Sequence, residues 1–292
     1  MLSTQPTESR SELPARALPQ FQTEVGRQCQ GKLWSNLRDV CGLLHIPCPA
    51  AIADGEILFQ HVQYKTGQRI HLIGQEFDSF CIVNSGFLKT VSIDEFGNEQ
   101  VLSFPMKGDL LGVDSIYTKQ YSSEAVALSD CNLILLPFKT LTALGHTHAE
   151  FEHAIYGVMS RELMRKEALV SMLGAPNAEA RVSRFLVSLA DKYSEIGYSG
   201  TIFNLRMTRQ EIGSYLGLSL ETVSRTLSAL DDIGLISVNQ RAIRINNRDM
   251  LKGLRRIPPS KSRARPLMPG NSQSTANWPR PAAGALANSL VN

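Results

Sequence analysis

The stretch "TRQEIGSYLGLSLETVSRTLSAL", residues 208–230, holds two short segments of helical periodicity that flank Gly217. Thr208 and Glu211 have the spacing of a capping box, which marks the start of a helix, and Ser219 is a suitable cap for the second segment. The apolar residues that can lock the two helices together are Ile212, Leu216, Leu218, Val223 and Leu227. Because glycine tolerates a tight turn, the stretch predicts a helix-turn-helix.

The second predicted helix carries a polar face, because Glu221, Ser224 and Arg225 follow the i, i+3, i+4 spacing. In such a unit this helix enters the DNA major groove. Arg225 can donate to guanine O6 and N7, Glu221 can accept from cytosine N4, and Ser224 can contact thymine or phosphate. The alternative is an ordinary surface ion pair between Glu221 and Arg225. The predicted DNA-contacting residues are Thr208, Arg209, Glu221, Thr222, Ser224 and Arg225.

The residues on either side extend this unit into a domain. Downstream, "LISVN" and "AIRIN" are joined at Gln240 and Arg241 and have the pattern of a two-stranded wing. Upstream, "NAEARVSRFLVSLADKYSEIG" begins at Asn177, a suitable helix cap, and its apolar residues recur at helical spacing. We therefore predict a winged helix-turn-helix domain, mostly helical, over residues 177–253.

Residues 26–148 have the signals of a β domain. Glycine recurs at positions 67, 74, 86, 97, 108 and 112, between short stretches of partial alternation such as "FLKTVSID". Turns spaced this regularly predict a small antiparallel barrel or jelly roll. The fold class is thus α+β: an N-terminal antiparallel barrel or jelly roll, a long helix and a C-terminal winged helix-turn-helix.

The apolar pattern of residues 149–174 predicts one long helix, which ends at Gly174 and Pro176. Its apolar residues follow steps of four, seven and three with one lysine in the gap, a pattern typical of a two-stranded seam. We predict a homodimer helix; the alternative is packing against its own β domain. The predicted seam residues are Met159, Leu163, Lys166, Val170 and Leu173.

Composition bounds the remaining possibilities. A chain of 292 residues with 43% hydrophobic content can form two domains. We find no apolar run near 18 residues and no signal-peptide pattern, so we expect a cytoplasmic protein without a membrane partner. Residues 1–25 and 254–292 have disordered composition. The net charge of +3 comes from the last segment, a basic tail that either holds phosphates or is simply solvated.

Residues 40–250 resemble the CRP/FNR family of bacterial transcription regulators, through "SGFLKTVSIDEFGNEQVLSFPMKGDLLG", the long helix and "MTRQEIGSYLGLSLETVSRTLSALDDIGLI". The arrangement of Glu221, Ser224 and Arg225 is similar to the FNR branch, whereas the cyclic-AMP branch typically has glycine in place of the serine. The resemblance implies a homodimer that reads a palindrome with TTGAT-like half-sites in double-stranded DNA, with RNA polymerase as a partner.

The resemblance also guides expectations about the signal. Cyclic-nucleotide-binding relatives carry a glutamate after G-D-x-x-G and an Arg-Ser pair about ten residues later. Here Val113 and the pair Ser122 and Ser123 occupy those places, so the cation that a cyclic phosphate needs is missing. We predict that cyclic AMP is not the ligand.

The FNR branch suggests an iron–sulfur cluster, and the candidate ligands are Cys29, Cys41, Cys48 and Cys131. Their spacing departs from the family: if Cys41 is aligned with its last N-terminal cysteine, Ser35 and Lys32 stand where the others are expected. Three alternatives stay open: thiol redox sensing, haem or another small molecule, and buried cysteines without a role. The chain has five cysteines, and Cys81 is best interpreted as a small apolar residue. We predict a regulator that responds to oxygen or redox state; the alternative is control by abundance alone.

An enzyme is the remote alternative. His146, His148 and Glu152 have a spacing that resembles half of the cupin metal motif, and this reading implies a metalloprotein. The stretch follows the last predicted strand, however, and we find no G-x-S-x-G, H-E-x-x-H, Walker or Rossmann pattern. We predict a binding protein rather than an enzyme.

Overall fold

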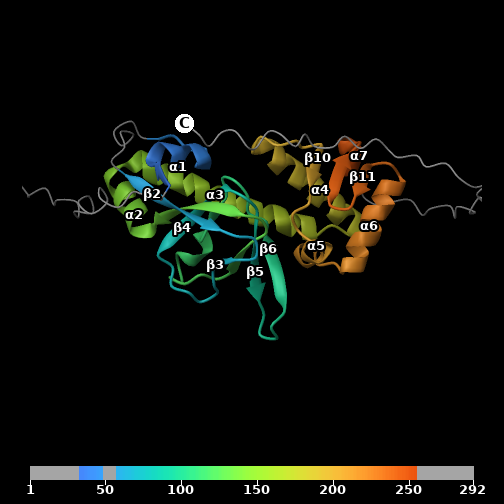
Figure 1. The fold of residues 1–292 in the computed structure, drawn as a ribbon, viewed down its shortest axis with the longest axis horizontal. Helices are drawn as coiled ribbons and strands as arrows, with labels where there is room; N and C mark the ends of the chain where they lie inside the picture. Colours follow the sequence, from blue (N-terminus) through green and yellow to red (C-terminus); the bar gives the residue numbers. More distant parts are fainter. Residues whose placement is uncertain (1–32, 49–56, 255–292) are drawn as a thin grey trace, which may run out of the picture. The chain divides into compact units, whose positions relative to one another are not determined.

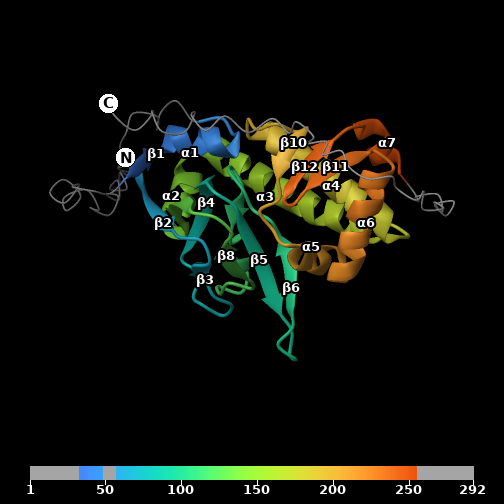
Figure 2. The ribbon, with the colours of Figure 1, turned by 45° about the vertical axis from the view of Figure 1, so that its right-hand side comes forward.

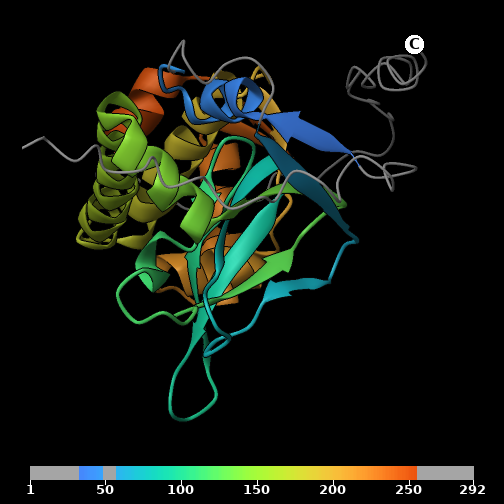
Figure 3. The same ribbon diagram turned by 90° about the vertical axis from the view of Figure 1, so that its left-hand side faces the viewer.

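The computed structural model describes residues 33–48 and 57–254. The predicted disordered segment 1–25, Cys29 and the basic tail after residue 254 lie outside this part of the chain. The N-terminal half forms two antiparallel sheets rather than one closed barrel, which matches the jelly-roll form of the prediction (Figures 1 and 3). The five-stranded sheet has the order β1 (Trp34–Asn36), β2 (Leu58–Tyr64), β9 (Cys131–Pro137), β4 (Ser79–Ser85) and β7 (Leu110–Leu111). The four-stranded sheet has the order β3 (Arg69–His71), β8 (Glu124–Ala127), β5 (Leu88–Ile93) and β6 (Glu99–Ser103).

The central strands of the five-stranded sheet, β9 and β4, are buried on both faces, which explains why they do not alternate between apolar and polar residues. Phe80 and Ile82 of β4 pack toward three helices, whereas Cys81 and Val83 pack toward the four-stranded sheet. The helices on the outer face are α1 (Leu37–Leu44), α2 (Phe138–Thr147) and α3 (Ala149–Leu173). The helices, the five-stranded sheet and the four-stranded sheet thus form three layers, with one apolar core between each pair of neighbouring layers.

Helix α3 spans the predicted residues almost to the residue, and α2 was not predicted. The two helices meet at His148, whose extended backbone interrupts the run. Met172, Phe151 and Val158 are the buried residues of α3. Among residues 33–48 and 57–254, none of the helices has the length and hydrophobicity of a membrane-spanning segment.

The C-terminal part has the predicted helices and wing, with one additional strand, β10 (Ile202–Asn204), and one additional helix, α7 (Arg248–Gly253), after the wing. Its other elements are α4 (Ala178–Glu195), α5 (Arg209–Leu216), α6 (Leu220–Asp232), β11 (Ile236–Asn239) and β12 (Ala242–Ile245). Asn177 caps α4 through its side chain, as predicted. Strand β10 pairs with β12 and completes a three-stranded sheet that the sequence did not indicate.

Strand β6 of the N-terminal half lies beside α5, as Figure 2 shows. The Ser214 hydroxyl on α5 accepts from the Val101 amide at 2.9 Å and donates to the Glu99 carbonyl at 3.2 Å. The Phe104 ring lies 5.1 Å from the Tyr215 ring, and both belong to the apolar core around α4. The two halves therefore share a core, and the predicted domain limits stay predictions.

Candidate nucleic-acid interface

The caps that define the two helices of the motif are those that the sequence predicts. The Thr208 hydroxyl accepts from the Glu211 amide at 3.1 Å, and the Glu211 carboxylate accepts from the Thr208 amide at 2.7 Å, which completes a capping box. Gly217 ends α5 with a φ of 64°, in the left-handed region that glycine adopts readily. The Ser219 hydroxyl then accepts from the Thr222 amide at 3.2 Å and caps α6.

Gly213, in the middle of α5, allows the turn to pack closely, a role that the sequence analysis missed. A Cβ atom on Gly213 would lie 2.5 Å from the Leu218 carbonyl oxygen. The Leu218 amide also donates to the Gly213 carbonyl at 2.9 Å. The turn therefore folds directly onto the helix at a place where only hydrogen fits.

We expect Gly213→Ala to lower the free energy of unfolding by about 2 kcal/mol or more, because the added methyl overlaps backbone that cannot rotate away. Urea denaturation measures the change. The matched control is Gly157→Ala in α3, where a Cβ meets nothing within 4 Å and the better helix propensity of alanine is expected to stabilise by up to about 1 kcal/mol. Equal effects of the two substitutions would contradict the close packing.

Helix α6 exposes the predicted polar face and buries the opposite one. Glu221 and Arg225 are exposed and Ser224 is half-buried, whereas the buried residues are Val223, Thr226, Leu227 and Leu230. Within this helix no ion pair joins Glu221 to Arg225; the Arg225 guanidinium lies 3.5 Å from the Thr222 hydroxyl. The backbone amide of Glu221 itself, then the Ser219 hydroxyl and Arg225, hold the pKa of Glu221 below its ordinary value. The face thus presents a carboxylate and a guanidinium to the solvent.

Arg209 connects α5 to the wing. Its guanidinium donates to the Gln240 carbonyl at 3.0 Å, in the turn between β11 and β12. Burial, and then the neighbouring Arg241, lowers the pKa of Arg209. Arg209 is half-buried, so one of its functions is to hold the wing against the start of α5; its contact with DNA stays a prediction.

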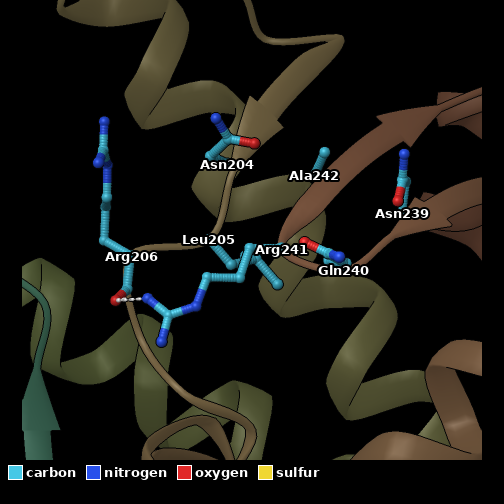
Figure 4. A pocket seen from close by; sticks show the side chains of 7 residues that line it. All are labelled: Asn204, Leu205, Arg206, Asn239, Gln240, Arg241 and Ala242. Atoms are coloured by element: carbon cyan, nitrogen blue, oxygen red, sulfur yellow. Dashed lines mark hydrogen bonds between the residues drawn. The ribbon is translucent and has the colours of Figure 1, made fainter. Parts of the chain in front are cut away.

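A groove of about 370 Å³ lies beside the wing, and its basic residues were also missed by the sequence analysis. Figure 4 shows Arg206 and Arg241 at this groove, with the Arg241 guanidinium directed toward the Arg206 carbonyl at 3.5 Å. Both side chains belong to exposed residues. Their signal in the sequence is their place next to the predicted wing turn, where arginine can contact phosphate.

Helix α3 exposes apolar side chains at heptad spacing. Tyr156, Leu163 and Val170 are 57%, 61% and 69% exposed, and they follow one another at intervals of seven residues. Of the other predicted seam residues, Met159 and Leu173 are half-buried. Lys166 is exposed, and its ammonium group lies 3.8 Å from the Asp114 carboxylate. The described residues do not cover this row, and its role in a dimer stays a prediction.

Two of the predicted cysteine ligands lie together. Cys41, on α1, is 1% exposed, and its side chain shares a hydrogen bond with that of Cys48. Burial, and then the Cys48 thiol beside it, raises the pKa of Cys41 to about 12. Cys48 is half-buried.

Cys131 lies elsewhere. It pairs with Tyr64 at the far end of β2, whereas Asn36, next to α1, pairs with Leu58; six residues of strand span about 20 Å. The Cys131 thiol donates to the Ser129 carbonyl at 3.0 Å, and Gly86 leaves no space beside it, since a Cβ there would lie 2.5 Å from the sulfur.

An all-cysteine cluster needs four thiolates at one place. The described residues bring two of the predicted ligands together and enclose the third in a different core, and they hold no group of three or more metal-binding side chains. The donor set of Cys41, Cys48 and Cys131 therefore does not fit such a cluster. His146, His148 and Glu152, the basis of the metalloprotein alternative, likewise form no metal-binding group within the described chain; Glu152 accepts from the Tyr156 hydroxyl at 2.6 Å.

The residue before the Ser122–Ser123 pair packs against the chain's own side chains. Tyr121, next to Ser122, is 5% exposed, and its ring stacks on His71 with centroids 3.9 Å apart. The cation on the neighbouring strand, Arg69, donates to the buried Glu124 carboxylate at 2.7 Å. Its charge is therefore already compensated.

Two family descriptions match the chain: a cyclic nucleotide-binding domain at residues 61–148 and a Crp-like helix-turn-helix domain at residues 180–254. The transcriptional regulatory protein btr of Bordetella pertussis is 33% identical over 218 residues, which cover 75% of this chain and 90% of the relative. An anaerobic regulatory protein of Aggregatibacter actinomycetemcomitans is 32% identical over 232 residues, 77% of this chain and 90% of the relative.

Among solved structures, FixK2 from Bradyrhizobium japonicum has a TM-score of 0.62 with 25% identity, covering 69% of this chain and all of that one. A jelly-roll domain of the cyclic nucleotide-binding type, followed by a long helix and a Crp-like helix-turn-helix domain, defines a class of DNA-binding transcription regulators rather than enzymes. The chain belongs to the CRP/FNR family.

Proposed function

We propose that the protein is a homodimeric regulator that reads a two-fold symmetric DNA site with TTGAT-like half-sites. The observation that carries this proposal is the exposed face of α6, where Glu221, Ser224 and Arg225 lie opposite the buried apolar residues. The apolar heptad row on α3 supports a dimer, because a two-fold protein matches a palindrome. RNA polymerase is the proposed partner, and the cytoplasm, where the chromosome lies, is the proposed location.

We propose further that the regulator responds to redox state. Relatives named anaerobic regulatory proteins support this response, and so does the contact between two thiols at the end of α1. The enclosed Cys131 argues against a cluster held by the four predicted cysteines. Ser122 and Ser123, which stand in place of the Arg-Ser pair of cyclic-nucleotide-binding relatives, argue against cyclic AMP. Control by abundance alone remains the second candidate, and equal DNA affinity of reduced and oxidised protein would favour it.

The test is titration of the full-length reduced protein with three labelled duplexes of equal length and base composition. One carries two TTGAT half-sites with centres about 10 base pairs apart. In the second, one half-site is moved by half a helical turn, and the third is scrambled. We expect binding to the first duplex to be on the order of 10³-fold tighter than to the scrambled one. Equal affinity for all three would overturn the proposed reading of a symmetric site.

A further inference from the structure

The chain reverses direction at the end of α1, and the reversal brings two cysteines together. Helix α1 ends at Leu44, and His45 adopts the left-handed conformation with a φ of 52°. The Ile46 amide then donates back to the Cys41 carbonyl at 3.0 Å. Cys48 therefore returns to the last turn of the helix, where it packs against the apolar cluster that contains Cys41 and its side chain meets that of Cys41.

The two thiols differ in accessibility. Cys41 is 1% exposed among the apolar residues of α1 and β4, whereas Cys48 is half-buried. A small oxidant can reach Cys48 first, and Cys41 is in place to react with the product.

We propose that Cys41 and Cys48 form an intramolecular disulfide when the protein meets a hydroperoxide, an inference that deepens the proposed redox response and rests on it. The Cys48 thiolate attacks one peroxide oxygen and the O–O bond breaks, which leaves a sulfenic acid on Cys48 and releases water or an alcohol. The Cys41 sulfur then attacks the Cys48 sulfur, and the S–O bond breaks. The leaving hydroxide takes the Cys41 proton and departs as water. Two thiols are oxidised, the peroxide is reduced, and a dithiol reductant reverses the change.

The end of α1 also touches the helix that carries the heptad row. The Leu44 carbonyl accepts a hydrogen bond from the Arg161 guanidinium of α3. On the other side, the Leu43 carbonyl packs against Gly108, where a Cβ would lie 3.0 Å away. A disulfide of about 2.05 Å draws the two sulfurs closer than a hydrogen bond does, so the displacement falls on the residues between them. Formation of the disulfide thereby displaces Leu44 relative to Arg161 of α3.

The first experiment counts thiols in the full-length protein. Reduced protein is treated with hydrogen peroxide, denatured and alkylated, and the tryptic peptide 39–65, which contains both cysteines and no other, is weighed. We expect this peptide to lose two hydrogen atoms and to resist alkylation until it is reduced. On a non-reducing denaturing gel we expect the protein to migrate as a single chain, without a disulfide between chains. Alkylation of both cysteines after peroxide treatment, or a crosslink between chains, would overturn the proposal.

Three variants define the order of events. Cys41→Ala is expected to accumulate sulfenic acid on Cys48, detected with a dimedone probe, and Cys48→Ala is expected to resist peroxide at residues 39–65. Cys131→Ala, which removes a thiol outside the pair, is the matched control and is expected to form the disulfide normally. If both Cys41→Ala and Cys48→Ala instead lost bound iron that the unaltered protein retains, the two cysteines would be metal ligands and the proposal would be wrong.

The final measurement separates this inference from the DNA-binding proposal. Operator affinity is measured for the reduced and oxidised forms of the unaltered protein and of Cys48→Ala. We expect oxidation to change the dissociation constant of the unaltered protein by at least about 5-fold and to leave that of Cys48→Ala unchanged. Disulfide formation without an affinity change would overturn the coupling to α3, whereas failure of the reduced protein to bind the operator would overturn only the DNA-binding proposal.

Discussion

Leu163→Glu is expected to convert the protein into monomers and to weaken operator binding by on the order of 100-fold or more. Leu163 is 61% exposed in the middle of the heptad row, so the substitution leaves the cores of the chain intact. In a two-stranded seam, however, the two copies of this residue would meet, and burying two carboxylates against each other is costly. A monomer contacts one half-site only and loses the advantage of the second, joined site.

Analytical ultracentrifugation and operator titration of the same preparation measure the two effects. The matched control is Ala168→Glu, which adds the same charge to an exposed position of α3 outside the heptad row. We expect Ala168→Glu to remain dimeric and to bind DNA normally. A Leu163→Glu protein that remains dimeric would show that this row does not form the contact between the two copies.

The elements that the sequence predicted well are those that depend on neighbours along the chain. The capping box at Thr208, the left-handed turn at Gly217 and the cap at Ser219 each involve residues within four positions of one another. Local hydrogen bonds and steric limits on the backbone decide such features, so their residue types are sufficient evidence.

The features that the sequence did not predict depend on distant segments. The contact of Ser214 with β6 joins residues more than 100 positions apart, and nothing in either segment indicates the other. The enclosed position of Cys131 follows from the pairing of β9 with β2 and from Gly86. A count of cysteines could propose ligands, but only the register of the strands shows which of them meet.

The meeting of Cys41 and Cys48 lies between these two cases. The two residues are close along the chain. Their contact, however, depends on the left-handed conformation of His45, a residue type that adopts a positive φ only occasionally. Spacing alone therefore suggested a ligand set shared with other cysteines. The backbone reversal instead makes the two thiols partners of each other.

Arg225→Ala is expected to weaken binding to the symmetric site by on the order of 100-fold, with a much smaller effect on a scrambled duplex. A guanidinium that bonds guanine O6 and N7 contributes roughly 1–3 kcal/mol of discrimination at each half-site, and a dimer has two. The structure supports this role because Arg225 is exposed on α6 and forms no ion pair with Glu221 within the helix. Fluorescence anisotropy with both duplexes at several salt concentrations measures the ratio of affinities.

Two further variants distinguish base reading from simple attraction to phosphate. Arg225→Lys keeps the positive charge but loses the planar pair of donors, so a base-reading role predicts a large loss of specificity, and a phosphate contact predicts almost none. Arg184→Ala, which removes an exposed arginine that contacts the Ser171 carbonyl from α4, controls for the change in net charge. If Arg225→Ala lowered the affinity for both duplexes equally and Arg225→Lys restored it, Arg225 would be a phosphate contact. The discrimination at the guanine would then have to come from Glu221, which can accept from the paired cytosine.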